Sequence, residues 1–334
     1  MTRTGDSGPG RAVGLALALG TGGLLALLGP LLLGLDSRAS LTSRSGLRGA
    51  PYLWLCDRDG RRLVALDADA LVVQERFLPC PLEAATLPGG GVVVLVAEGG
   101  RQGSSRYLVH MDPAGRQTAS VALPPLSCRS LVGDGLGAVH LLGEGPGGVE
   151  LLRWRPGLEV ERLGCCPGGR ELRSGAGTLW LLREEGALPL AGGPWPRGPG
   201  VLLDLAFDER GAFELRSVSG RRLLRRIDGG RVRDRFLTGV PRWLSAAADT
   251  GGAWCVEASG EVSWSDPDLQ VERVGRLAQR PLRGTVSGGG ELWSISPGGV
   301  ERLALGRGRL PGQGGFASLE AVARGADVAG APGP

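Results

Sequence analysis

The side chains that most often carry out acid–base or metal chemistry are sparse in this sequence. Its 334 residues include two His, His110 and His140, and both stand inside apolar, strand-like runs. None of the six Cys has the Cys-x-x-Cys or Cys/His spacing of a zinc site. The cysteines are Cys56, Cys80, Cys128, Cys165, Cys166 and Cys255. These patterns favour structural histidines and predict no metal site.

Three of the cysteines are expected to be buried. Cys56, Cys165 and Cys166 fall in or beside strand-like segments, where a buried free thiol is the common case. The even number of cysteines permits disulfides if the protein is exported, but it does not require them.

Two further motifs are better explained as turns than as ligand sites. Asp57-Arg58-Asp59-Gly60 resembles the opening of a calcium loop, but Ala68 stands where such a loop needs its final Glu. The Gly-x-Gly run at residues 133–137 has no following helix to hold a phosphate. We therefore expect no catalytic residue and no cofactor, and predict that the protein is not an enzyme.

One segment has an unusual charge. Residues 221–235 contain seven arginines, offset by Asp228 and Asp234. A solvated outer hairpin that turns at 228–230 would explain them, with the Arg stems covering apolar surface. A contact with lipid headgroups or an acidic partner is the alternative. The candidate anionic-contact residues are Arg221, Arg222, Arg225, Arg226, Arg231, Arg233 and Arg235.

The N-terminal region predicts a membrane anchor. Residues 12–35 lack charge, and as a helix they would span roughly 36 Å, enough for a hydrocarbon core of about 30 Å. A short tail (1–11) precedes this transmembrane helix and a polar tether (36–50) follows it. A cleaved signal peptide, with the mature chain starting near Ala39, is the alternative. Flanking charges do not decide the orientation, and we favour an extracytoplasmic domain because such anchors resemble uncleaved export signals.

The remainder of the chain carries an internal repeat. A Gly-containing turn followed by a short apolar run, often with Trp, recurs at steps of 40, 46, 40, 34, 41 and 38 residues. A step near 40 is the size of a four-stranded propeller blade. The seven runs are APYLWLCD (50–57), GGVVVLVA (90–97), LGAVHLLG (136–143), GTLWLLRE (177–184), GAFELRSV (211–218), GAWCVEAS (252–259) and GELWSISP (290–297).

This repeat predicts an all-β protein, a β-propeller of about seven blades over residues 51–323, with a disordered tail at 324–334. A pair of β-sandwiches is the alternative. Four Trp in the repeated runs are expected in the core: Trp54, Trp180, Trp254 and Trp293. The Pro/Gly-rich segment 188–200 predicts an irregular fourth blade. Residues 316–322 are expected to supply the inner strand that the first blade lacks, since an open ring leaves unpaired edges.

The repeat resembles that of the NHL/YVTN group of propellers, with its apolar strand, its Asp57-x-x-Gly60-like turn and its alternating strand. The resemblance covers about residues 50–323 and implies the fold only. Calcium-dependent lactonases of propeller fold use Glu, Asn and Asp ligands, and this chain contains no Asn, so that ligand set cannot be assembled.

Composition limits the partners. The chain has neither Lys nor Asn, a bias typical of GC-rich bacterial genomes, and its net charge of +4 does not indicate nucleic acid. We expect a membrane-anchored, non-enzymatic binding or scaffolding propeller whose partner is a protein or a cell-envelope polymer. The alternative is an exported propeller enzyme with its site at the central channel. Convergent carboxylates or His there would favour the enzyme, and an apolar or Arg-lined channel would favour binding.

Overall fold

The computed structural model describes residues 52–98, 105–175, 177–247, 251–286, 290–306, 308–314 and 319–324. The predicted transmembrane helix at 12–35 and the tether at 36–50 lie outside these residues. Within the ranges described, the regular elements are β-strands in seven antiparallel sheets. No helix in this part of the chain has the length and apolarity to cross a membrane.

Each sheet is one blade, and its strands follow one another from the centre of the ring outward. The first is β27 (Leu319–Arg324), β1 (Leu53–Asp57), β2 (Arg62–Leu66) and β3 (Val72–Phe77). The second is β4 (Pro81–Thr86), β5 (Val92–Glu98), β6 (Ser105–Met111) and β7 (Gln117–Ala122). The third is β8 (Ser127–Gly133), β9 (Val139–Gly145), β10 (Gly148–Trp154) and β11 (Glu161–Cys165).

The fourth blade has three strands: β12 (Glu171–Gly175), β13 (Thr178–Leu182) and β14 (Ala187–Pro189). The fifth is β15 (Val201–Phe207), β16 (Gly211–Val218), β17 (Arg221–Asp228) and β18 (Arg231–Phe236). The sixth is β19 (Pro241–Ala247), β20 (Gly252–Glu257), β21 (Glu261–Ser265) and β22 (Val271–Arg276). The seventh is β23 (Arg283–Val286), β24 (Leu292–Ser296), β25 (Gly299–Ala304) and β26 (Gly308–Gly314).

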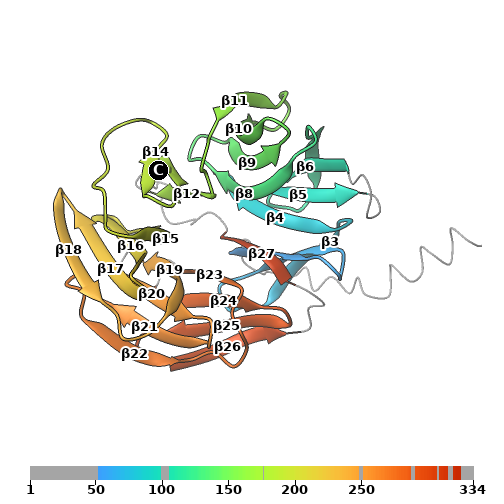
Figure 1. Cartoon of the computed structure of the whole chain (residues 1–334). Coiled ribbons are helices and arrows are strands. Elements are labelled where there is room, and N and C mark those ends of the chain that lie inside the picture. The colour runs from blue at the N-terminus through green and yellow to red at the C-terminus, as the bar shows by residue number, and fades with distance from the viewer. Residues whose placement is uncertain are drawn as a thin grey trace, which may run out of the picture. The chain divides into compact units, whose positions relative to one another are not determined.

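The inner strands form a closed ring. In order around the ring they are β27, β4, β8, β12, β15, β19 and β23, and β23 packs against β27 to complete it. Figure 1 shows these strands around a common centre, with the outer strands of each blade at the periphery. The predicted all-β, seven-bladed propeller is thereby confirmed, and the pair of β-sandwiches is excluded.

The second strand of each blade is largely buried on both faces because it packs between two neighbouring blades, and in most blades it is mainly apolar. In β5, Val92, Val94 and Val96 join a core cluster with the first blade. The alternate residues Val93 and Leu95 join a cluster with the third blade. A strand buried on both faces has no solvent-exposed side, so apolar and polar residues do not alternate along its sequence.

The four tryptophans expected in the core are buried. Trp54, Trp254 and Trp293 are at most 1% exposed, and Trp180 is 7% exposed. The indole of Trp254 also donates to the carbonyl of Gly290 at 3.0 Å. Each ring therefore removes a large apolar area from water where the blades meet.

The C-terminal strand closes the ring, as the sequence predicts. β27 pairs antiparallel with β1, with Leu55 opposite Val322. It spans 319–324 rather than the expected 316–322, and its first side chain, Leu319, is buried. The first blade thus combines the two ends of the propeller sequence, and the inner edge of β1 is paired.

The fourth blade is irregular, also as predicted. Its outer strand is replaced by the segment 190–200, which is held by side chains. Trp195 packs edge-on against Trp180, with ring centroids 4.5 Å apart. The buried Arg216 guanidinium donates to the carbonyls of Pro199 and Glu185 at 2.8 and 2.9 Å. An arginine and an aromatic cluster therefore take the place of a hydrogen-bonded strand.

Two local predictions have different outcomes. Asp57 closes a turn by accepting from the Gly60 N–H at 3.2 Å, and it also pairs with Arg62 at 2.8 Å. The turn interpretation is confirmed. Cys56 and Cys166 are buried, whereas Cys165 is exposed, so its predicted burial is wrong. Cys165 ends the outermost strand of its blade, where few neighbours cover it.

Candidate binding site in the central channel

A shared backbone irregularity positions the polar residues of the channel. The inner strands of five blades skip one residue in their pairing with the next strand, which marks a β-bulge near the start of each strand. A bulge redirects the side chains beside it. The skipped residues are Leu82, Arg129, Leu203, Arg242 and Glu320. Three of the bulges are followed by a polar residue, namely Glu83, Ser130 or Asp204.

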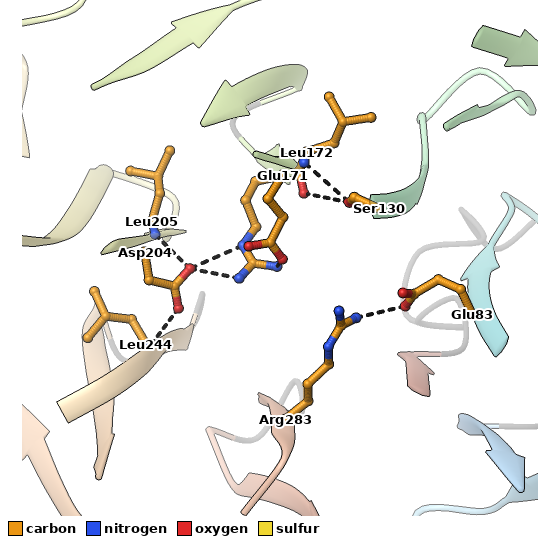
Figure 2. A network of polar contacts seen from close by, with 9 residues as sticks. Glu83, Ser130, Glu171, Leu172, Asp204, Leu205, Leu244 and Arg283 are labelled. Atoms are coloured by element: carbon orange, nitrogen blue, oxygen red, sulfur yellow. Dashed lines mark hydrogen bonds and ion pairs between the residues drawn. The ribbon is translucent and has the colours of Figure 1, made fainter. Parts of the chain in front are cut away.

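Asp204 links three consecutive blades (Figure 2). Its carboxylate accepts from the backbone N–H of Leu244, in the sixth blade, at 2.8 Å and from Arg173, in the fourth blade, at 2.7 Å. It also accepts from the N–H of Leu205. The inner edge of an inner strand has no further strand to pair with, so a carboxylate satisfies donors that would otherwise lack a partner.

Ser130 makes the corresponding contact between the third and fourth blades. Its hydroxyl accepts from the Leu172 N–H at 3.2 Å and donates to the Leu172 carbonyl at 3.4 Å. Beside it, Glu171 forms an ion pair with Arg173 at 2.6 Å. Burial lowers the pKa of Arg173, but Asp204 and Glu171 outweigh that effect, and its pKa lies above the ordinary value. Arg173 is therefore fixed in its charged form.

Glu83 and Arg283 form the remaining pair of Figure 2. Arg283 Nη1 lies 2.8 Å from a Glu83 carboxylate oxygen, and the pair joins the second blade to the seventh. The first blade, with its inner strand β27, stands between them in the ring. Burial raises the pKa of Glu83 to about 7, and the nearby charge of Arg283 offsets only part of that shift.

A cavity of about 540 Å³ opens among the inner strands of the third to seventh blades. That volume lies within the range of small-molecule sites. The carboxylates in its wall are Glu171 and Asp204, and both are paired with Arg173. The basic side chains in its wall are Arg129, Arg170, Arg173, Arg242 and Arg283.

These arginines differ in how far they are engaged. Arg129 pairs with Glu144 and donates to the Gly169 carbonyl. Arg170 donates to a carbonyl, but its Nε is buried and has no hydrogen-bond partner in the described structure. Arg242 is exposed, and no hydrogen bond or ion pair of its side chain occurs among the described residues. Positive charge therefore exceeds negative charge in this wall.

The predicted arginine hairpin forms where the sequence places it, turning at 228–230. Pairing of β17 with β18 sets Arg226 opposite Arg233 and Asp228 opposite Arg231. Because side chains alternate along a strand, the run is divided between two faces of the sheet. The face towards the sixth blade carries Arg222, Arg226, Arg231, Arg233 and Arg235, and the other face carries Arg221 and Arg225.

The seven arginines do not form one surface. Arg226 is fully buried, pairs with Asp208 at 2.9 Å and lies over the Phe213 ring. Arg225 is nearly buried and donates to the Arg197 carbonyl. These two cannot reach a lipid headgroup or an external partner.

The other five lie nearer the surface. Arg222 donates to the Pro241 carbonyl, and Arg221 stacks on the Phe236 ring. Arg233 pairs with Asp268, while Arg235 donates to the Leu269 carbonyl at 2.7 Å. Arg231, beside the turn, is exposed. Most of their charge is directed at the neighbouring blade or at the blade's own outer strand.

The channel residues escaped prediction, although the repeat contained a signal for them. Glu83, Ser130, Asp204 and Arg283 stand nine or ten residues before the centre of the apolar run of their own blade. Equivalent positions in a ring of repeats lie at equivalent depths, so polar residues there converge on the channel.

The histidines do not take part in this channel network. His140 is buried and bonds through Nε2 to Asp134 at 3.0 Å. Burial lowers its pKa despite that carboxylate. Among the described residues, no group of three or more His, Cys, Asp or Glu side chains is arranged to hold a metal ion.

No protein-family model matches the chain, and no curated protein matches it in sequence. Solved structures match at low identity. A Lactobacillus plantarum protein is 11% identical with a TM-score of 0.57, over 84% of this chain and 100% of that one. The Neurospora crassa Pan2 WD40 domain is 12% identical with a TM-score of 0.56, over 74% of this chain and 82% of that one.

A Bacteroides fragilis protein, provisionally named a 6-phosphogluconolactonase, is also similar. It is 11% identical with a TM-score of 0.55, over 86% of this chain and 99% of its own. At such identities the likeness concerns the fold and carries no ligand or reaction across. The chain is a seven-bladed β-propeller, as its repeat predicts.

Proposed function

We propose that this chain is a membrane-anchored, non-enzymatic binding propeller, and that an anionic group of its ligand enters the cavity of the central channel. The observation that carries the proposal is the cavity wall. Five arginines line it, and its two carboxylates are both paired with one of them, Arg173. An anion entering the cavity gains Coulomb energy from Arg242 and Arg170 in surroundings that screen charge less than bulk water does.

The carboxylates of the wall have structural partners that favour binding over catalysis. Asp204 accepts two backbone N–H groups as well as Arg173, so removing it from this network would leave buried donors unpaired. A general base must be free to take a proton from a substrate. Asp204 and Glu171 are instead held by the groups that keep adjacent blades together.

The proposed location rests on the sequence. Residues 12–35 would anchor the protein, and the tether at 36–50 would hold the propeller on the extracytoplasmic side. A protein or a cell-envelope polymer with carboxylate or phosphate groups is the partner that this placement and the charge of the cavity favour. The anchor is tested by washing membranes with carbonate. A soluble protein with its N-terminus near Ala39 would instead establish a cleaved signal peptide.

The binding proposal is tested by an unbiased pull-down from solubilised membranes with three baits. The wild type and Arg231→Ala should recover the same partner, because Arg231 is an exposed arginine of the outer hairpin and does not line the cavity. Arg242→Ala should lose most of it. Equal recovery by wild type and Arg242→Ala, with loss in Arg231→Ala, would move the binding site to the outer hairpin.

One observation favours an exported enzyme as the second candidate. Glu83 has a pKa raised to about 7 by burial, which suits a general acid near neutral pH. The two functions are separated by incubating the recovered ligand with purified protein. Recovery of the ligand unchanged supports binding. Conversion by the wild type and not by Glu83→Gln would establish the enzyme.

A further inference from the structure

The pair formed by Glu83 and Arg283 already contains an anion bound at the cavity wall. The carboxylate lies 2.8 Å from the guanidinium. The two side chains differ in exposure: Arg283 is 44% exposed and lines the cavity, whereas Glu83 is 14% exposed and is not among the residues that line it. A ligand in the cavity can therefore reach Arg283, where its anionic group would compete with the Glu83 carboxylate for the guanidinium.

The groups that face Glu83 favour loss of its charge once Arg283 is withdrawn. Across the channel, Glu171 repels the carboxylate, and Arg173, which attracts it, is already paired with Glu171 and Asp204. From the third blade the neighbour is Cys128, a thiol whose pKa is raised to about 12, chiefly by burial, so it is neutral. Arg283 is thus the main source of stabilisation for the ionised form among the described side chains.

We propose, on the basis of the function proposed above, that an anionic group of the ligand displaces Glu83 from Arg283 and that Glu83 takes up one proton from solvent as it is displaced. One guanidinium in a partly buried site cannot neutralise two carboxylate-like charges, and an unpaired buried charge is costly. The bond that forms joins the proton to the Glu83 carboxylate. The ligand binds without covalent change, and its charge replaces that of Glu83 beside Arg283.

The coupling gives the site a defined pH dependence. Burial holds the pKa of Glu83 at about 7, so the proton is largely in place at pH 6 and largely absent at pH 8. When only the protonated fraction is competent, the apparent affinity falls with that fraction, by about tenfold between pH 6 and pH 8. Neutral Gln at this position should bind the anion at both pH values as the wild type does at pH 6.

The test uses sulfate, whose charge is constant between pH 6 and pH 8, and the purified full-length protein in detergent at constant ionic strength. Calorimetric titration in two buffers with different enthalpies of ionisation measures the protons taken up for each sulfate bound. The wild type should take up close to one proton at pH 8 and bind about tenfold more tightly at pH 6. Glu83→Gln should remove both effects and retain binding.

Glu150→Gln is the matched control. Glu150 is 15% exposed and pairs with Arg162 at 2.7 Å, so it resembles Glu83 in burial and partner, but it lies between outer strands of the third blade. This variant should keep the proton uptake and pH dependence of the wild type. The same behaviour in Glu83→Gln would overturn the inference.

The outcomes separate the two proposals. If the wild type fails to bind sulfate at either pH, the anion-binding function and the inference both fall. If it binds sulfate equally at pH 6 and pH 8 without proton uptake, the function stands and the inference falls. The proton count is measured on the wild type, so it decides the inference even if Glu83→Gln does not fold.

Discussion

The central channel and the outer hairpin of the fifth blade are both rich in arginine, and they arise in opposite ways. The hairpin carries seven arginines within fifteen consecutive residues, 221–235. The cavity wall collects five that are spread from Arg129 to Arg283. In the hairpin, alternation of side chains divides a dense run between two faces of a sheet. In the channel, the ring of inner strands brings distant residues together.

The difference shows that local charge density is a poor guide to a site in a β-protein. A strand sends successive side chains in opposite directions, so Arg225 and Arg226 are neighbours in sequence but lie on opposite faces of the sheet. Conversely, a repeat of about 40 residues places equivalent positions at one depth of the ring. Charge that recurs at the period of the repeat therefore says more about a binding site than charge that is contiguous.

The largest expected effect is a loss of stability when the inner strand of the first blade, β27, is removed and the hairpin is left intact. Truncation after Gly315 deletes β27, which pairs with β1 and packs against β4 and β23. The loss should cost about 5 kcal/mol or more, equal to a fall in Tm of roughly 10–20 °C for a domain of this size. Deleting only residues 327–334 should leave Tm unchanged. An unaltered Tm after the longer deletion would show that β27 contributes little to closure.

The next largest effect is a loss of stability that distinguishes the buried arginines of the hairpin from the exposed ones. Arg226→Ala leaves the buried Asp208 carboxylate without its guanidinium and should destabilise the protein by about 3–5 kcal/mol. Arg231→Ala, five residues away and exposed, should change stability by less than about 0.5 kcal/mol. Urea unfolding of both variants measures the comparison. Similar small losses would mean that the hairpin is a uniformly solvated surface, as charge density alone suggests.

Much of the fold could be predicted because each repeat contains a run of large apolar residues that is recognisable in the sequence. The seven spaced runs, among them those around Trp54, Trp254 and Trp293, indicate the number of blades. The need to pair the edge of β1 indicates the closing strand. The apolar periodicity is visible in a single sequence, and the missing inner strand of the first blade follows from the rule that exposed strand edges are avoided. The exact start of that strand depended on pairing register, which the short segment SLEAVA does not specify.

The channel site could not be predicted in the same way. Its polar residues follow β-bulges, and a bulge such as that at Leu203 is decided by the fit of one strand to its neighbour. Glu83 and Arg283 are 200 residues apart, and only the closed ring brings them within 2.8 Å. The exposure of Cys165 was missed for a related reason, because sequence pattern does not separate an outer strand from an inner one when both are short.

A smaller effect concerns the pH dependence of stability. The pKa of Glu83 is raised by burial to about 7 from an ordinary value of 4.5, so folding favours its protonated form. Its stabilising contribution is present below pH 4.5 and is lost as the pH rises through 7. Relative to Glu83→Gln, the wild type should lose about 3 kcal/mol of unfolding free energy between pH 4.5 and pH 8. Chemical denaturation at several pH values measures the difference, and Glu150→Gln serves as the control.

A constant difference between wild type and Glu83→Gln across that range would mean that Arg283 keeps Glu83 ionised throughout. The channel would then hold a fixed ion pair, comparable to those that hold the arginines of the hairpin. Arg283 would then be engaged in a permanent ion pair, in the same way as Arg233, which pairs with Asp268 near the protein surface.

The smallest effect on stability is expected for substitution of Arg242, the residue that best distinguishes the central channel from the outer hairpin. Arg242 occupies a bulge, is exposed, and has no hydrogen bond or ion pair among the described residues, so Arg242→Ala should change stability by less than about 0.5 kcal/mol. Its charge nevertheless stands in the cavity wall, where a charge a few ångströms from a bound anion contributes about 1 kcal/mol even under strong screening. Sulfate affinity should therefore fall about fivefold in Arg242→Ala and stay unchanged in Arg231→Ala, with both proteins equally stable. An equal fall in both variants would show that sulfate responds to the net charge of the protein, and the arginines of the channel would then have no advantage over those of the hairpin.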